Sequence, residues 1–222
     1  MRTKIGCVLA AAGVLVVAGA ASAQPATISY SETVPNQDSN WTETLQLPQF
    51  DPSLGTLTGI TLSIDGSFAG EFAFENASNG ELQVLNISRK WLISVEPVDG
   101  PTRAALLQIE DEWTRGPLVL APFDGTFDFD GPSGNTDVFT GAASGSVSIF
   151  DFSVYTGLDT VGFILDHDAP FAFDTIGGSY GFGAFSTAGA TLTVTYDYFI
   201  PAPGSLAAML LLGGLTTARR RR

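Results

Sequence analysis

The sequence predicts an all-β protein with a single β-sandwich domain of the jelly-roll or immunoglobulin-like kind. Three observations support this prediction. Apolar and polar residues alternate with a period of two in many short segments, which is typical of half-buried strands. Gly, Pro, Asn and Asp gather between these segments, where they supply turn geometry. No apolar pattern of helical period continues beyond a few residues in the central part of the chain.

The chain begins with a segment typical of a secretory signal peptide. A basic start, residues 1–4, precedes an apolar stretch at residues 5–20, and Ala21-Ser22-Ala23 forms an A-x-A cleavage site. We therefore expect signal peptidase to cut after this motif, so that the mature protein begins at Gln24. The alternative is an uncleaved transmembrane anchor, which the cleavage motif disfavours.

The strand pattern is clearest in two segments. In residues 56–64, the side chains of Ile60, Leu62 and Ile64 share one face, and the apolar face changes near Gly59, so we expect a bend or bulge there. In residues 190–199, apolar and aromatic residues alternate with threonines. Further strands are expected at residues 68–74, 81–87, 91–95, 105–113, 118–121, 144–150 and 160–165. Residues 177–189, rich in glycine and aromatics, form either a loose loop or a strand packed tightly on a neighbour.

The end of the chain has the order of a membrane-addressing signal. Pro201-Ala202-Pro203-Gly204 interrupts the last strand, residues 205–218 are apolar or small, and four arginines follow: Arg219, Arg220, Arg221 and Arg222. A helix of this apolar segment would be about 21 Å long, which is short for a bilayer. Its cationic end would stay on the cytoplasmic side, so we expect a transient stay in the inner membrane. The alternative is a C-terminal core helix with a solvated basic end.

Between these two segments the chain is strongly acidic. Residues 24–200 carry four Lys and Arg against all 23 Asp and Glu, a formal net charge of −19. Such a charge excludes nucleic acid as a partner and suits cation binding outside the cell. The one cysteine, Cys7, lies in the signal segment, so no disulfide is expected. The length suffices for one domain with a sizeable core.

Two resemblances follow from the motifs. The tail resembles the PEP-CTERM sorting signal of Gram-negative bacteria, with Ala202 in place of the usual glutamate, and this implies removal of the tail by an exosortase-type membrane protease. Residues 41–57 (WTETLQLPQFDPSLGTL), 123–134 (FDGTFDFDGPSG) and 194–198 (VTYDY) resemble three motifs of the choice-of-anchor E domain, in the same order. That resemblance implies a bacterial surface or secreted protein, and it implies no established activity.

The acidic loop at residues 124–137 is the best candidate for a site. Ca²⁺ takes six to eight oxygen ligands from carboxylates and carbonyls, and we expect Asp128 and Asp130 to project to the same side of a strand and share one ion. The loop lacks the spacing of an EF-hand. The alternative is a turn-rich loop whose aspartates accept backbone amides. No other cofactor is expected.

Three other groups of residues are candidate chemical sites. His167, between Asp166 and Asp168, could assist acid–base chemistry, but a solvated turn is the favoured interpretation. Glu110-Asp111-Glu112 could supply a glycosidase carboxylate, although a solvated strand end is favoured. Three tryptophans could stack on sugars, but we expect at least two of them in the core: Trp41, Trp91 and Trp113.

No catalytic constellation emerges from these residues. The favoured function is an exported, non-catalytic β-sandwich protein of the bacterial envelope or extracellular matrix, at the cell surface or released. A carbohydrate- or Ca²⁺-binding module is the alternative, with extracellular polysaccharide as a partner. A hydrolase of unrecognised type is the third hypothesis.

Overall fold

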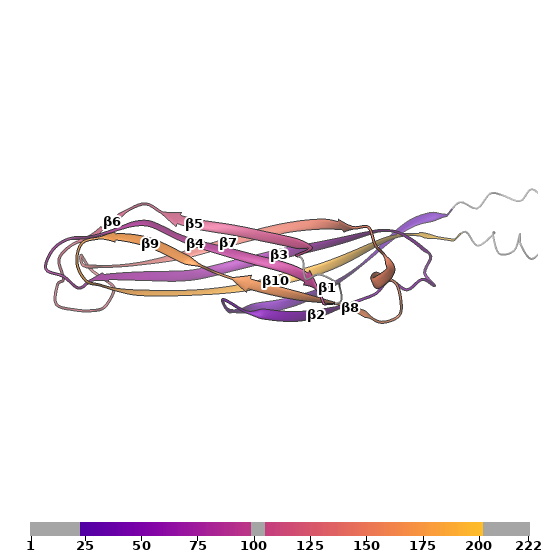
Figure 1. The fold of residues 1–222 in the computed structure, drawn as a ribbon, viewed down its shortest axis with the longest axis horizontal. Helices are drawn as coiled ribbons and strands as arrows, with labels where there is room; N and C mark the ends of the chain where they lie inside the picture. The colour runs from indigo at the N-terminus through magenta and orange to yellow at the C-terminus, as the bar shows by residue number, and fades with distance from the viewer. Residues whose placement is uncertain (1–22, 99–104, 202–222) are drawn as a thin grey trace, which may run out of the picture. The chain divides into compact units, whose positions relative to one another are not determined.

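The computed structural model describes residues 23–98 and 105–201, which form two antiparallel β-sheets (Figure 1). The prediction of an all-β sandwich is confirmed. Residues 1–22 of the predicted signal peptide and residues 202–222 of the predicted tail lie outside the described residues. Within the described residues, no helix is long and apolar enough to cross a membrane.

The first sheet, here called sheet A, contains the longest strands. Its order is β1 (Gln24–Asp38), β10 (Tyr180–Ile200), β3 (Thr56–Asn76) and β7 (Gly134–Ile149). The strand β10 therefore lies between β1 and β3, and it pairs with β3 over almost its whole length. Because β1 pairs with β10, both terminal strands belong to one sheet.

The second sheet, sheet B, is built around β4 (Leu82–Pro97). The strands β5 (Leu107–Arg115) and β6 (Leu118–Leu120) both pair with one edge of β4 and are separated by Pro117. The strands β8 (Thr160–Asp168) and β9 (Phe171–Ile176) both pair with the other edge of β4 and are separated by Pro170. Proline cannot donate to a ladder, which accounts for both interruptions. The strand β2 (Thr42–Pro48) pairs with β8, and a short 3₁₀ helix, η1 (Ser153–Tyr155), precedes β8.

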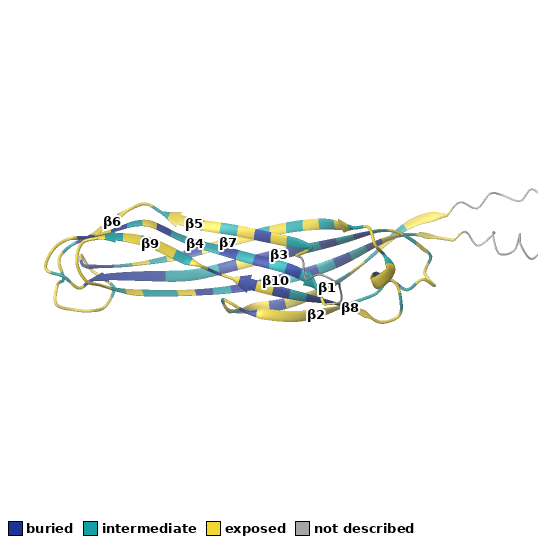
Figure 2. Cartoon of the chain, in the orientation of Figure 1, coloured by how far each residue is buried: buried dark blue, intermediate teal, exposed yellow. Residues whose placement is uncertain are grey.

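The core fills the space between the sheets. Buried residues alternate with more exposed ones along β3, β4 and β10, as Figure 2 shows. Aromatic rings dominate: Trp91 stacks on Phe68 with ring centroids 5.5 Å apart, and Phe72 contacts Phe74, Trp113 and Phe139. Each fully buried ring of this kind contributes about 1.5–3 kcal/mol, so this cluster holds the two sheets together.

The outer face of sheet A is rich in short hydroxyl side chains. Hydroxyls of β1 and β10 pair across the sheet: Ser29 with Thr195 at 2.9 Å, Ser31 with Thr193 at 2.8 Å, and Thr33 with Thr191 at 3.0 Å. The same rows continue through Thr61 and Ser63 of β3 to serines of β7. These residues provide the polar half of the period-two pattern.

The predicted strands are present, most of them longer than expected. The bulge near Gly59 is confirmed, because Thr58 is the extra residue where the register between β3 and β10 shifts. Residues 180–189 belong to β10, so the tightly packed strand is the correct alternative there. The strands β1, β2 and β9 were not among the predicted strands.

Candidate functional site

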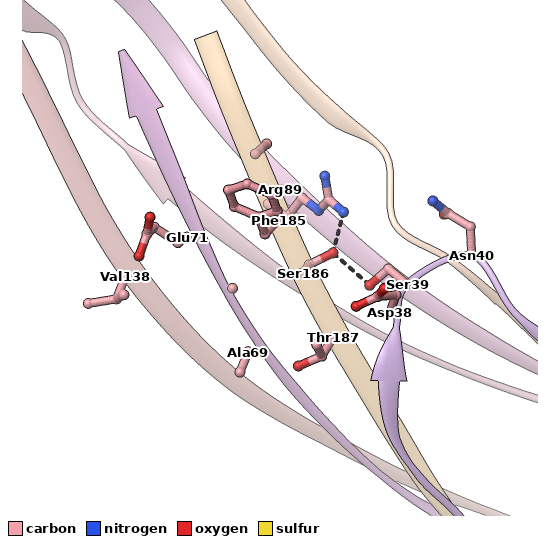
Figure 3. A pocket seen from close by; sticks show the side chains of 12 residues that line it. Asp38, Ser39, Asn40, Ala69, Glu71, Arg89, Val138, Phe185, Ser186 and Thr187 are labelled. Atoms are coloured by element: carbon pink, nitrogen blue, oxygen red, sulfur yellow. Dashed lines mark hydrogen bonds between the residues drawn. The ribbon is translucent and has the colours of Figure 1, made fainter. Parts of the chain in front are cut away.

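A pocket of about 540 Å³ lies where the chain crosses from sheet A to sheet B (Figure 3). The strand β1 ends at Asp38, and Asn40 then adopts a left-handed conformation with φ of 66°. The amide of Ser39 still donates to the carbonyl of Ser186 in β10, whereas the carbonyl of Trp41 accepts from the amide of His167 in β8. The crossover thus leaves β10 without its β1 neighbour at the pocket.

Arg89 is the cation of this pocket. It occupies an inward-facing position of β4 between Ile87 and Trp91, and its side chain is only 8% exposed. The guanidinium donates from Nη2 to the hydroxyl of Ser186 and lies over the ring of Phe171, 5.9 Å from the ring centroid. Its Nε is buried without a partner. Burial lowers the pKa of Arg89, and the nearby Asp168 carboxylate partly opposes this.

A chain of hydrogen bonds connects Arg89 with the buried His167. Ser186, which accepts from Arg89, donates to the hydroxyl of Ser39 at 2.6 Å, and the Ser39 hydroxyl contacts Nε2 of His167 at 3.2 Å. The Nδ1 atom of His167 lies 3.0 Å from the carbonyl of Leu92. Nδ1 therefore carries the proton and donates to the carbonyl, and Nε2 accepts from Ser39. The imidazole is neutral in this arrangement, and burial lowers its pKa.

The rim of the pocket combines an exposed aromatic ring with carboxylates. Phe185 of β10, Glu71 of β3 and Val138 of β7 form one cross-strand row on the outer face of sheet A. Phe185 is 71% exposed, although it is a large apolar side chain. Asp38 and Asn40 line the opposite side. The pocket therefore offers hydrogen-bond donors, acceptors and a flat apolar surface within reach of one small ligand.

The interpretation of His167 as part of a solvated turn is wrong. The residue lies within β8, is only 2% exposed, and packs against the rings of Trp41 and Phe68 at 5.3 and 6.0 Å. The flanking Asp166 and Asp168 lie on the exposed side of the strand. Their acidic side chains made the whole tripeptide look exposed in the sequence, although His167 between them faces inward. The sequence analysis also missed Arg89. The signal was its place in the inward row of β4, where an arginine between two large apolar residues is unusual.

Asp128 and Asp130 lie in the connection between β6 and β7, and the expectation of one strand carrying both is wrong. Phe129 between them has a left-handed conformation with φ of 60°, which breaks the alternation. Asp128 accepts the amide of Asp130 at 3.1 Å, and Asp130 accepts the amide of Gly131 at 2.7 Å. Each carboxylate keeps one oxygen that these bonds do not use. A shared Ca²⁺ ion stays a prediction.

The remaining predicted groups are placed as follows. Glu110 lies within β5 and forms an ion pair of 2.7 Å with Lys90, so this acidic triplet is mid-strand, not at a strand end. Trp41 and Trp91 are buried, and Trp113 packs on the core, which confirms the core assignment. In the part of the chain that the structure describes, no three His, Cys, Asp or Glu residues gather as a metal cluster.

No protein-family model matches the chain, and no curated protein matches it. Among solved structures, the VP2 subviral particle of infectious bursal disease virus is similar at 10% identity over 79% of this chain, with a TM-score of 0.22. This chain spans only 38% of that protein's length. A mud crab tombus-like virus structure is similar at 10% identity, with a TM-score of 0.20, over 94% of this chain and 100% of the viral chain.

Proposed function

We propose that the chain is an exported, non-catalytic β-sandwich protein that binds a neutral polysaccharide outside the cell through the Arg89 pocket. The observation that carries the proposal is the composition of this pocket: a buried guanidinium, two carboxylates, an amide and hydroxyls beside an exposed phenylalanine. Sugars present hydroxyls that both donate and accept, together with an apolar ring face. Planar polar side chains and one aromatic ring match both features.

The charge around the pocket favours an uncharged ligand. Asp38 and Glu71 line it together with Arg89, and the mature protein is strongly acidic, so an anionic polymer would meet repulsion. The carboxylates can instead accept sugar hydroxyls, while Arg89 donates. This matches the extracellular polysaccharide expected as a partner from the sequence.

Export and sorting belong to the same proposal. The described fold begins with β1 at Gln24 and its last strand ends at Ile200, which are the limits of the predicted mature domain. Residues 25–199 form one compact unit. An arrangement of signal peptide, folded domain and PEP-CTERM-like tail fits a choice-of-anchor protein that signal peptidase and an exosortase-type protease process.

The test uses residues 24–200, titrated with neutral oligosaccharides and, separately, with oligosaccharides that contain uronic acid. We expect the neutral sugars to bind and Phe185→Ala to weaken binding by about tenfold, because the stacking ring is removed. The matched control is Phe150→Ala, which removes an even more exposed phenylalanine, 91% exposed, from the segment after β7. Equal affinity of both variants, or no binding of neutral sugars by the wild type, would contradict the proposal.

A serine hydrolase is the second candidate, because Ser39 contacts the His167 imidazole. A nucleophilic serine needs a free hydroxyl and a base that a third group orients, commonly a carboxylate. Here the Ser39 hydroxyl also accepts from Ser186, and a backbone carbonyl orients the imidazole. We therefore expect a serine-directed fluorophosphonate to leave Ser39 unlabelled. Labelling of Ser39 that Ser39→Ala abolishes would favour the hydrolase.

A further inference from the structure

Glu75 is buried beneath the acidic loop on the outer face of sheet A. It lies at the end of β3, in a cross-strand row with Gly181 of β10 and Gly134 of β7. The ring of Phe127 lies over Gly181, and the backbone of Asp130 lies over Gly134, at positions that any larger residue would fill. The two glycines therefore allow the loop to fold back over Glu75, whose side chain is 0% exposed.

The Glu75 carboxylate is only half satisfied. Its Oε2 accepts the amide of Phe129 at 2.7 Å, whereas its Oε1 is buried with no hydrogen-bond partner. No lysine or arginine within residues 23–98 and 105–201 forms an ion pair with Glu75. A buried carboxylate oxygen without a partner costs free energy, and a bound cation would satisfy it.

We propose that this site binds one Ca²⁺ ion, with Glu75 Oε1 as the charged ligand and the Asp130 carbonyl as a neutral ligand. The Asp130 carbonyl oxygen lies over Gly134, the cross-strand neighbour of Glu75. Calcium accepts carboxylate, carbonyl and water oxygens in a flexible geometry, whereas Mg²⁺ requires a near-ideal octahedron. With one carboxylate, the affinity belongs to the weak range of extracellular modules, about 0.1–1 mM.

The inference assigns new roles to Asp128 and Asp130. Their side chains accept the amides of Asp130 and Gly131 and so shape the backbone above Glu75. The ligands are then the buried Glu75 oxygen beneath the loop and the Asp130 carbonyl, while the two exposed carboxylates hold the loop in place. This differs from the pair of aspartates expected from the sequence, and the two alternatives give opposite results in one experiment.

The experiment measures the melting temperature of residues 24–200 in a chelator and in excess CaCl₂. An ion that binds only the folded state stabilises it, and we expect a rise of about 3 °C for a domain of this size. Glu75→Gln should abolish the rise, whereas Glu81→Gln, which removes the same charge from an exposed position just before β4, should preserve it. MgCl₂ should have less effect than CaCl₂.

Amide NMR of the wild type keeps the test decisive if Glu75→Gln does not fold. Titration with CaCl₂ should shift the amides of residues 129–134 in a saturable manner. Three outcomes overturn the proposal: no response of the wild type, saturable shifts only elsewhere, or a response that survives Glu75→Gln and is lost in the Asp128→Asn, Asp130→Asn double variant. A chelator-insensitive protein in which Glu75→Gln is as stable as the wild type would likewise mean that no Ca²⁺ ion binds at Glu75.

Discussion

Polar side chains inside the sandwich form one directed chain, from Arg89 through Ser186 and Ser39 to His167 and the carbonyl of Leu92. Every hydroxyl in it donates once and accepts once. Because these hydrogen bonds join β4, β10, the crossover and β8, they fix the point at which the backbone changes sheets. The two hydroxyls and the imidazole are thus satisfied together, although Nε of Arg89 has no partner, and the loss of one member leaves its neighbours unpaired.

The histidine makes stability depend on pH in a defined window. Burial lowers the pKa of His167 below its ordinary value of 6.5; Arg89 acts in the same direction, while the Leu92 carbonyl, Asp168 and Asp166 oppose the shift. The unfolded chain therefore binds a proton at a higher pH than the folded chain does. The stabilisation is complete above 6.5 and is lost as the pH falls through the lower, folded-state pKa.

Because the chain has one histidine, this prediction is specific. Between pH 7 and 5.5, above the range in which ordinary carboxylates titrate, the free energy of unfolding should decrease by up to about 1.4 kcal/mol per pH unit. His167→Gln keeps a donor and an acceptor but cannot titrate, so its urea-unfolding curve should be flat there. A wild-type curve that is equally flat would refute the assignment.

The sequence predicted burial correctly for large aromatic side chains, and it did not predict burial for polar side chains. At least two of the three tryptophans are expected in the core because a large aromatic ring in a small sandwich is usually buried, and Trp41 and Trp91 are buried. Arg89 and His167 were not expected there, because their burial depends on Ser186, 97 residues from Arg89, and on Ser39, 128 residues from His167. Glu75 escaped notice because the loop that covers it is far away in sequence.

At the scale of elements, the loop before β7 packs directly on glycines, because a side chain at their positions would occupy the space that the loop fills. Gly134→Ala would bring a Cβ against the backbone of Asp130, whereas Gly183, in β10, has open space around it. We expect Gly134→Ala to lower the free energy of unfolding by about 1–3 kcal/mol and to speed hydrogen exchange at residues 127–133. Gly183→Ala should be neutral or slightly stabilising. Equal effects of the two substitutions would show that the loop does not rest on Gly134.

The strands that were predicted best from the sequence are those with the most apolar side chains buried in the core. β3, β4 and the second half of β10 carry inward rows in which most side chains are apolar. β1 is an edge strand with mostly exposed residues, and its hydroxyls pair with β10, a contact that periodicity does not reveal. The first half of β10 is rich in glycine, which weakens any strand signal.

At the scale of the whole molecule, export and tail removal are open to direct measurement. Mass spectrometry of the extracellular protein should find Gln24 as the first residue and a last residue near 201–204. Deletion of residues 219–222 should impair processing, because the cationic end would no longer resist translocation. Extracellular protein that retains the four arginines, or starts at Met1, would refute the corresponding half of the proposal.

The pairing of β10 with both β1 and β3 also has a mechanical consequence. If the domain is held at its C-terminal end, Ile200, while a polymer pulls on the Phe185 side of the pocket, the force runs along β10. The hydrogen bonds on both sides of the strand between these two points are then loaded in shear, all at once, and not opened one after another. The domain would therefore resist extension best along its strands. Under the proposed function, a bound polysaccharide would pull in this direction.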